Sequence, residues 1–188
     1  MAPKKKAVAA ENQLFYIQYG IDLIKRKIMI DEEIEESAIG WVIRAITLMV
    51  ENNPEDPIEI YINSFGGCVY SGLALYDLLD SLSTPIHTYC LGSAMSMSLV
   101  LYLVGDIRYS FPRSTFMAHS VSSGTEGTVR VQEVDIKEAK RLNDILIDIL
   151  ADRTKKSKKF WAETVKHDDF YMDSKKAKQL GIVTEIIE

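Results

Sequence analysis

The spacing of apolar residues along the chain predicts alternating helices and strands. Between Ile34 and Met49 apolar residues recur every three or four positions, which is typical of a helix with one buried face. Residues 58–62 instead alternate apolar and polar, as a strand with one buried face does. The same patterns predict helices over 69–82 and 95–104, and strands over 86–91, 107–110 and 114–118.

This order of elements predicts an α/β fold. Repeated strand–helix–strand units favour a parallel sheet with right-handed crossovers. A long amphipathic helix is expected at about 129–152, projecting from the sheet domain, and two short helices and a strand over 182–187 close the chain. Residues 1–13, with their basic start, are predicted to be a flexible tail, which leaves residues 14–188 as a single domain.

Composition narrows the functional classes. The chain has 188 residues and a net charge of −5, which fits a globular protein and argues against a nucleic-acid binder. Cys68 and Cys90 show neither metal-ligand spacing nor a disulfide framework, so we expect no metal and a reducing compartment, the cytoplasm. The sequence indicates no secretion signal, no membrane-spanning helix and no nucleotide-binding or other cofactor motif.

Two glycine-containing turns are the candidate binding positions. The first spans Asn63–Gly67, and the second spans Gly92–Ser96 after a predicted strand end at Leu91. Ligands of parallel sheets bind beyond the carboxyl ends of the strands, and each turn leads into a helix whose first N–H groups can face an anion. Gly66 and Gly67 let the backbone approach a ligand closely.

Ser96 in the second turn has two interpretations, a serine nucleophile or a small residue packed in a buried helix, and the local sequence alone favours packing. Ser96 stands at the start of an apolar helix, where the N–H of Met97 can stabilise an oxyanion. Ser93 and Ser98 are alternative nucleophiles on the same grounds.

A serine nucleophile needs a base and an orienting acid. The three histidines are His87, His119 and His167, and His119 is slightly favoured because it ends a predicted strand before a polar loop. Asp168 and Asp169 are the candidate acids.

Several ordered motifs together resemble one family. They are Ile62-Asn63-Ser64-Phe65-Gly66-Gly67, Tyr76-Asp77, Gly92-x-Ala94-x-Ser96-Met97, Met117-x-His119 and the C-terminal run from Asp169 to Ile182. In this order, over roughly residues 25–187, they resemble the proteolytic subunit of Clp protease.

The resemblance implies a serine endopeptidase with a crotonase-like α/β fold of repeated βαβ units. It assigns Ser96 as nucleophile, His119 as base, Asp169 as orienting acid, and the N–H groups of Gly67 and Met97 as the oxyanion hole. It implies two stacked heptameric rings that interdigitate through the long helix, which is the family's handle. It also implies an ATP-driven AAA+ unfoldase that feeds in unfolded chains, while the subunit itself binds no nucleotide. The residues that match the docking patch for that unfoldase are Tyr61, Tyr89, Leu91, Tyr109 and Phe111.

The chain departs from the family's usual residues at several positions near the proposed site. They are Phe65 for proline, Met95 for alanine, Ser98 for glycine, Ser120-Val121 for Gln-Pro, and Asp168 for arginine. Three other functions stay open at this point: a non-catalytic subunit of a mixed ring, a capsid-maturation or self-processing peptidase of the same fold, and a crotonase-type acyl-CoA enzyme.

Overall fold

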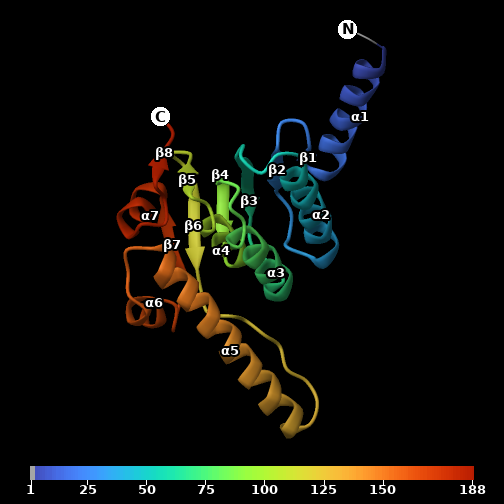
Figure 1. Ribbon diagram of the computed structural model, residues 1–188. Helices are drawn as coiled ribbons and strands as arrows, with labels where there is room; N and C mark the ends of the chain where they lie inside the picture. Colours follow the sequence, from blue (N-terminus) through green and yellow to red (C-terminus); the bar gives the residue numbers. More distant parts are fainter. Residues whose placement is uncertain (1–2) are drawn as a thin grey trace.

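The computed structural model describes the backbone of residues 3–188 and the side chains of residues 10–188. Within this part of the chain, eight strands form one sheet, and seven helices pack around it (Figure 1). The strands are β1 (Ile21–Asp22), β2 (Lys27–Ile30), β3 (Ile58–Ser64), β4 (Ile86–Met95), β5 (Ile107–Ser110), β6 (Thr115–Ala118), β7 (Phe170–Asp173) and β8 (Glu185–Ile186). The helices are α1 (Pro3–Tyr19), α2 (Glu36–Asn52), α3 (Val69–Asp80), α4 (Met97–Leu103), α5 (Val129–Arg153), α6 (Lys158–Thr164) and α7 (Ser174–Leu180).

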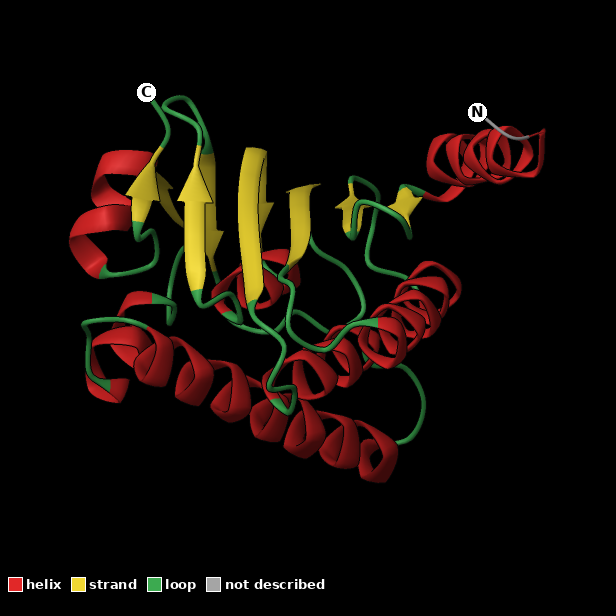
Figure 2. Ribbon diagram, turned by 45° about the horizontal axis from the view of Figure 1, so that its top comes forward, coloured by secondary structure: helices red, strands yellow, loops and turns green. Residues whose placement is uncertain are grey.

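The predicted alternation of helices and parallel strands is confirmed. Strands β2, β3, β4 and β5 lie side by side and parallel, and α2, α3 and α4 connect them in turn. Ile58, Ile60 and Ile62 of β3 are buried, while the residues between them turn to the other face of the sheet. Figure 2 shows the strands side by side, with the long helix α5 and shorter helices below them.

Strand β4 is longer than predicted. The strand end predicted at Leu91 is wrong, because β4 continues to Met95 through most of the turn expected over Gly92–Ser96. Residues 87–90 pair with β5, and residues 93–95 pair with β6. The strand changes its partner at the glycine-containing segment, where its register against β3 also shifts. The helix expected over 95–104 therefore begins at Met97.

The N-terminal segment contains a helix that the sequence analysis did not predict. Residues 3–19 form α1, which includes the described part of the tail predicted over 1–13, and residues 1–2 lie outside the described residues. Asn12 anchors the helix, because its amide donates to Asp22 at 2.8 Å and its oxygen accepts the Leu23 N–H at 3.1 Å. The Tyr19 ring lies 4.9 Å from that of Trp41 on α2, which adds an aromatic contact. The proposed domain boundary after residue 13 falls inside this helix.

The long helix α5 divides into two halves of different character. It spans Val129–Arg153, close to the predicted 129–152, and it extends well beyond the sheet (Figure 1). Its second half docks on the domain through Leu142, Leu146 and Leu150, which are buried. Its first half exposes Val129 and Val134, which are 73% and 59% accessible. The apolar surface available to a partner therefore lies in the first half.

The C-terminal part contains the two predicted short helices, α6 and α7. It also adds β7, which the sequence analysis did not predict and which pairs antiparallel with β6. The last strand is only β8, shorter than the predicted 182–187. No helix of the described chain combines the length and apolarity needed to cross a bilayer.

Candidate active site

Ser96 occupies a sharp turn between β4 and α4. Its φ of 54° and ψ of −126° lie where residues other than glycine are rare. Such strained backbone persists where its surroundings over-determine it, and it clusters at active sites. The Ser96 N–H donates to the Met117 carbonyl of β6 at 2.9 Å, so the neighbouring strand holds the turn.

Strand register brings a histidine and a carboxylate to this serine. Met95 is paired with Met117, which sets His119, two residues further on, beside Ser96. His119 Nε2 lies 2.7 Å from Ser96 Oγ. Ala118 is paired with Phe170 in the antiparallel pair of β6 and β7. Asp169, the residue before Phe170, therefore lies close to His119, the residue after Ala118, and its Oδ1 is 3.4 Å from His119 Nδ1. The His119 side chain is 25% accessible and that of Asp169 is 51% accessible, so the carboxylate is half in solvent.

The structure separates these residues from the alternatives left open by the sequence. The ring of His87 lies 6.2 Å from that of Tyr109 on the sheet, and His167 is exposed in the turn after α6. Ser93 Oγ faces Asn63 Oδ1 at 3.4 Å, and Ser98 is fully buried.

Geometry also distinguishes between the two candidate acids, Asp168 and Asp169. Asp168 is exposed, and the carboxylate that reaches His119 is that of its neighbour Asp169.

The loop after β3 lies directly against the Ser96 turn. Gly66 and Gly67 have φ of 108° and 147°. A Cβ at Gly67 would stand 2.5 Å from the Ile34 carbonyl oxygen, so this position has no room for a side chain. The Ile34 N–H donates to Gly66 O at 2.8 Å, and the Cys68 N–H donates to Ile34 O at 2.7 Å. The main chain of Ile34 thus clamps the glycine loop, a role that no sequence motif indicated.

The other expected oxyanion donor, Met97, has a fixed position. Its side chain is fully buried, and a Cβ at Gly72 of α3 would stand 2.3 Å from its Cγ. Close packing between α3 and α4 therefore anchors the residue that follows Ser96.

A small cavity of about 60 Å³ adjoins Ser96 and His119. Its walls combine the polar Ser96, His119 and Ser122 with aliphatic side chains, which are Val69, Leu99, Val100, Val121, Leu146 and Leu150. The Val121 N–H donates to Asn143 Oδ1 at 3.1 Å, so α5 holds the segment that follows His119. The sequence analysis missed Asn143, whose only signal is a polar residue beside the apolar stripe of the helix.

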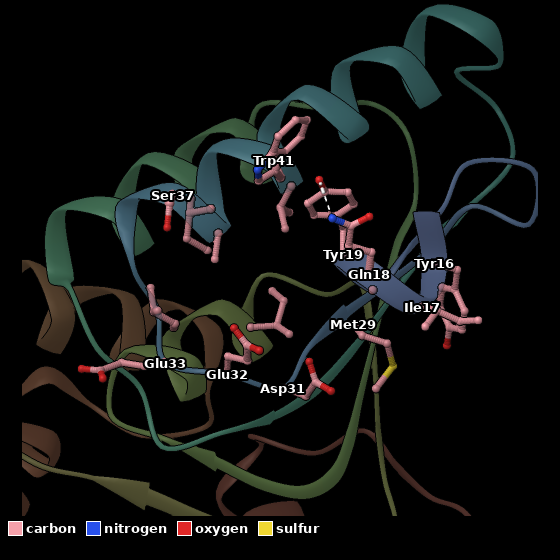
Figure 3. Close-up of a pocket in the computed structure, with 16 residues that line it drawn as sticks. Tyr16, Ile17, Gln18, Tyr19, Met29, Asp31, Glu32, Glu33, Ser37 and Trp41 are labelled. Atoms are coloured by element: carbon pink, nitrogen blue, oxygen red, sulfur yellow. Dashed lines mark hydrogen bonds between the residues drawn. The ribbon is translucent and has the colours of Figure 1, made fainter. Parts of the chain in front are cut away.

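A larger cavity of about 530 Å³ lies away from these residues, between α1, β2 and α2 (Figure 3). Tyr19 and Trp41 line one side, and Asp31, Glu32 and Glu33 line another. The dashed line in Figure 3 is the Gln18 amide, which donates to the Tyr19 hydroxyl at 3.0 Å. None of the predicted site residues lines this cavity, so its size does not make it the active site.

Three of the five residues matched to the docking patch lie side by side on one sheet face. Tyr61, Tyr89 and Tyr109 are paired across β3, β4 and β5, and successive rings stack with centroids 4.5 and 4.7 Å apart. Burial, with the nearby Glu59 charge, raises the pKa of Tyr89 to about 12. Leu91 and Phe111 extend the patch, and each is 37% accessible.

A polar cluster borders the tyrosine stack. Lys27 Nζ lies 2.8 Å from Glu59 Oε2, and the Tyr61 hydroxyl donates to the same oxygen at 2.9 Å. Burial alone would raise the pKa of Glu59, but the hydrogen bonds from Lys27 and Tyr61 outweigh it and lower the pKa. These bonds hold Glu59 ionised at the edge of the patch.

In this α/β domain the His119 imidazole lies between the Ser96 hydroxyl and the Asp169 carboxylate, which is the arrangement of a triad hydrolase. Comparisons with known proteins identify the family. The family model described as Clp protease matches residues 11–188, so the chain belongs to the Clp protease family. The ATP-dependent Clp protease proteolytic subunit of Deinococcus radiodurans is 33% identical over 175 residues, which cover 92% of this chain and 85% of that protein.

These comparisons confirm three predictions from the sequence: the family, the fold of that family, and the function of a Clp-type proteolytic subunit with peptidase activity. Neither comparison favours the three alternative functions. The roles of individual residues stay predictions.

Proposed function

We propose that this chain is a serine endopeptidase in which Ser96, His119 and Asp169 form a catalytic triad. The observation that carries the proposal is the 2.7 Å contact between Ser96 Oγ and His119 Nε2. This distance lies within the range that a nucleophile and its base require. The carboxylate on the far side of the imidazole supplies the third member.

The proposed reaction is acyl transfer in two steps. His119 Nε2 removes the proton of Ser96 as Oγ attacks the peptide carbonyl, and the imidazolium then protonates the leaving amine. A water molecule, deprotonated by the same nitrogen, attacks the acyl-enzyme and releases the second product. Asp169 faces Nδ1, where its charge favours the imidazolium and its oxygen favours the tautomer with the proton on that nitrogen.

The oxyanion of the tetrahedral intermediate is expected to bind the N–H groups of Gly67 and Met97. Both residues are anchored, Gly67 by the Ile34 main chain and Met97 by packing on Gly72. Donors that are already in position need no reorganisation during the reaction, which is the source of their catalytic effect.

The cavity beside Ser96 would receive the side chain that precedes the cleaved bond. Its aliphatic lining residues and its volume of about 60 Å³ fit a small aliphatic side chain better than an aromatic one. We therefore expect cleavage after small apolar residues.

We further propose a homo-oligomer of two stacked heptameric rings in the cytoplasm, joined through the exposed apolar half of α5. A Clp-type AAA+ unfoldase would dock on Tyr61, Tyr89, Leu91, Tyr109 and Phe111 and would deliver unfolded polypeptides. ATP would be used by that partner, and this chain would need no cofactor, metal, nucleic acid or membrane. The name of the Deinococcus radiodurans relative, which includes ATP dependence, supports this arrangement.

The test is hydrolysis of fluorogenic peptides, with and without an unfoldase, together with labelling by a fluorophosphonate. Ser96→Ala should lower kcat by about 10⁴-fold or more and abolish labelling, while assembly stays intact. Ser93→Ala is the matched control and should keep both, because Ser93 faces Asn63 instead of the imidazole. Loss of labelling in Ser93→Ala with labelling retained in Ser96→Ala would refute the assignment.

A further inference from the structure

Ser98 makes an unusual set of contacts for a buried serine next to a nucleophile. It is the second residue of α4 and is fully buried. Its hydroxyl oxygen accepts the Met95 N–H at 2.8 Å, and it lies 2.6 Å from the Ser64 carbonyl oxygen and 2.8 Å from the Met95 carbonyl oxygen. A hydroxyl has one proton and two lone pairs, so it can accept from Met95 while donating its proton to the nearer carbonyl, that of Ser64.

These contacts join the two loops of the candidate active site. Met95 is the residue before Ser96, and Ser64 ends the strand that leads into Gly66 and Gly67. The loops already touch, because a Cβ at Gly66 would stand 2.7 Å from Ser96 Cβ and 3.1 Å from the Met97 nitrogen. A shift of either loop would therefore change the distance between the nucleophile and the oxyanion donors.

We propose that Ser98 is a positioning residue for the peptidase reaction, because it sets the spacing between the Ser96 turn and the glycine loop. The inference rests on the proposed function, since it takes Ser96 as nucleophile and Gly67 and Met97 as oxyanion donors. Ser98 touches neither the imidazole nor the proposed substrate cavity, so its effect passes through the backbone of Met95 and Ser64.

The proposed role is consistent with the conformation of Ser96. The positive φ of Ser96 must be held by neighbouring groups. The Met117 carbonyl of β6 accepts the Ser96 N–H, and the Ser98 hydroxyl accepts the N–H of Met95, the residue before Ser96. Without the hydroxyl, the turn can relax. A displacement of about 1 Å at a reacting group can cost about 10²-fold in rate.

The experiment compares Ser98→Ala, which deletes the hydroxyl, with Ser98→Cys, which keeps a similar volume but only a weak donor. Ser114→Ala is the matched control, because Ser114 is also buried and its hydroxyl donates to a carbonyl, that of Cys90, at 2.7 Å. For each variant, kcat per fluorophosphonate-titrated site, KM, melting temperature and assembly size are measured with a fluorogenic peptide. We expect kcat to fall about 10-fold or more in both Ser98 variants, with KM within about twofold, and to stay near wild type in Ser114→Ala.

The outcomes separate the inference from the proposed function. If Ser96→Ala abolishes turnover but both Ser98 variants keep wild-type kcat per titrated site, the positioning role is wrong and the proposed function stands. If Ser96→Ala keeps turnover, the proposed function fails and the inference fails with it. If Ser98→Ala does not fold, the Ser98→Cys variant is the deciding one. A lower melting temperature of Ser98→Cys with an unchanged kcat per titrated site would show a purely structural role and refute the positioning role.

Discussion

Replacing Asp169 by Asn tests how much the half-exposed carboxylate contributes to the reaction. The substitution removes the negative charge 3.4 Å from His119 Nδ1 while keeping the shape of the side chain. In the proposed mechanism that charge stabilises the imidazolium that forms as Ser96 attacks. Its loss should therefore lower kcat more than it raises KM.

The expected size follows from the distance and the exposure. Two unit charges 3.4 Å apart interact by about 1.2 kcal/mol in water and by about 5 kcal/mol at an effective dielectric constant near 20. At about 1.4 kcal/mol for each factor of ten, these limits correspond to about 8-fold and about 4000-fold in rate. Because the Asp169 side chain is 51% accessible, solvent screens the charge, and we expect a loss of about 10- to 100-fold. That is less than the loss of about 10⁴-fold for the buried aspartate of other triads.

The assay is kcat with a saturating fluorogenic peptide, normalised to titrated active sites and to equal assembly size by light scattering. Asp168→Asn is the matched control, since it makes the same charge change one residue away on an exposed side chain. We expect Asp168→Asn to stay within about threefold of wild type, because solvent and distance screen that charge. A wild-type kcat in Asp169→Asn would refute the electrostatic argument, and a large loss only in Asp168→Asn would move the acid by one residue.

Three further predictions concern assembly, the oxyanion loop and pH. Val134→Asp should yield smaller assemblies in light scattering, because Val134 is 59% accessible on the exposed half of α5. Gly67→Ala should lower kcat by about 10²-fold or more, because the new Cβ would collide with Ile34 and displace an oxyanion donor. Because the pKa of Glu59 is lowered in the folded state, ionised Glu59 stabilises the folded protein at neutral pH. This contribution is lost as pH falls through the folded-state pKa. The melting temperatures of wild type and Glu59→Gln should therefore differ at pH 7 and converge in acid, and a constant difference would contradict this.

The periodic elements were predictable, and the pairing between them was not. Helices α2, α3 and α5 carry enough apolar periodicity to appear in the sequence. Strand β7 has only four residues and no clear alternation, so its pairing with β6 depends on contacts distant in the chain. The sequence predicts that strand β4 ends at Leu91, four residues too early. A pattern of side chains does not reveal that a strand pairs first with β5 and then with β6.

The site was predictable as a set of candidates. Local pattern slightly favours His119 and does not separate Ser96 from Ser93 and Ser98, which only the family resemblance does. The register of β4 against β6 is what distinguishes His119 from the other histidines. Asp168 and Asp169 are equivalent by composition, and only the antiparallel pairing of β7 orients one of them toward the imidazole.

The clamp on the glycine loop has a consequence for how this sequence can change over generations. Its bonds join main-chain atoms of Ile34 to those of Gly66 and Cys68, so side-chain replacement at Ile34 or Cys68 leaves them in place unless proline removes the N–H. Glycine at 67 has no such freedom, because any Cβ meets the Ile34 main chain. The main-chain clamp can thus persist while side chains around it change. Insertion or deletion between β2 and α2 is the change that a lineage would have to avoid, because it would carry Ile34 away from the loop.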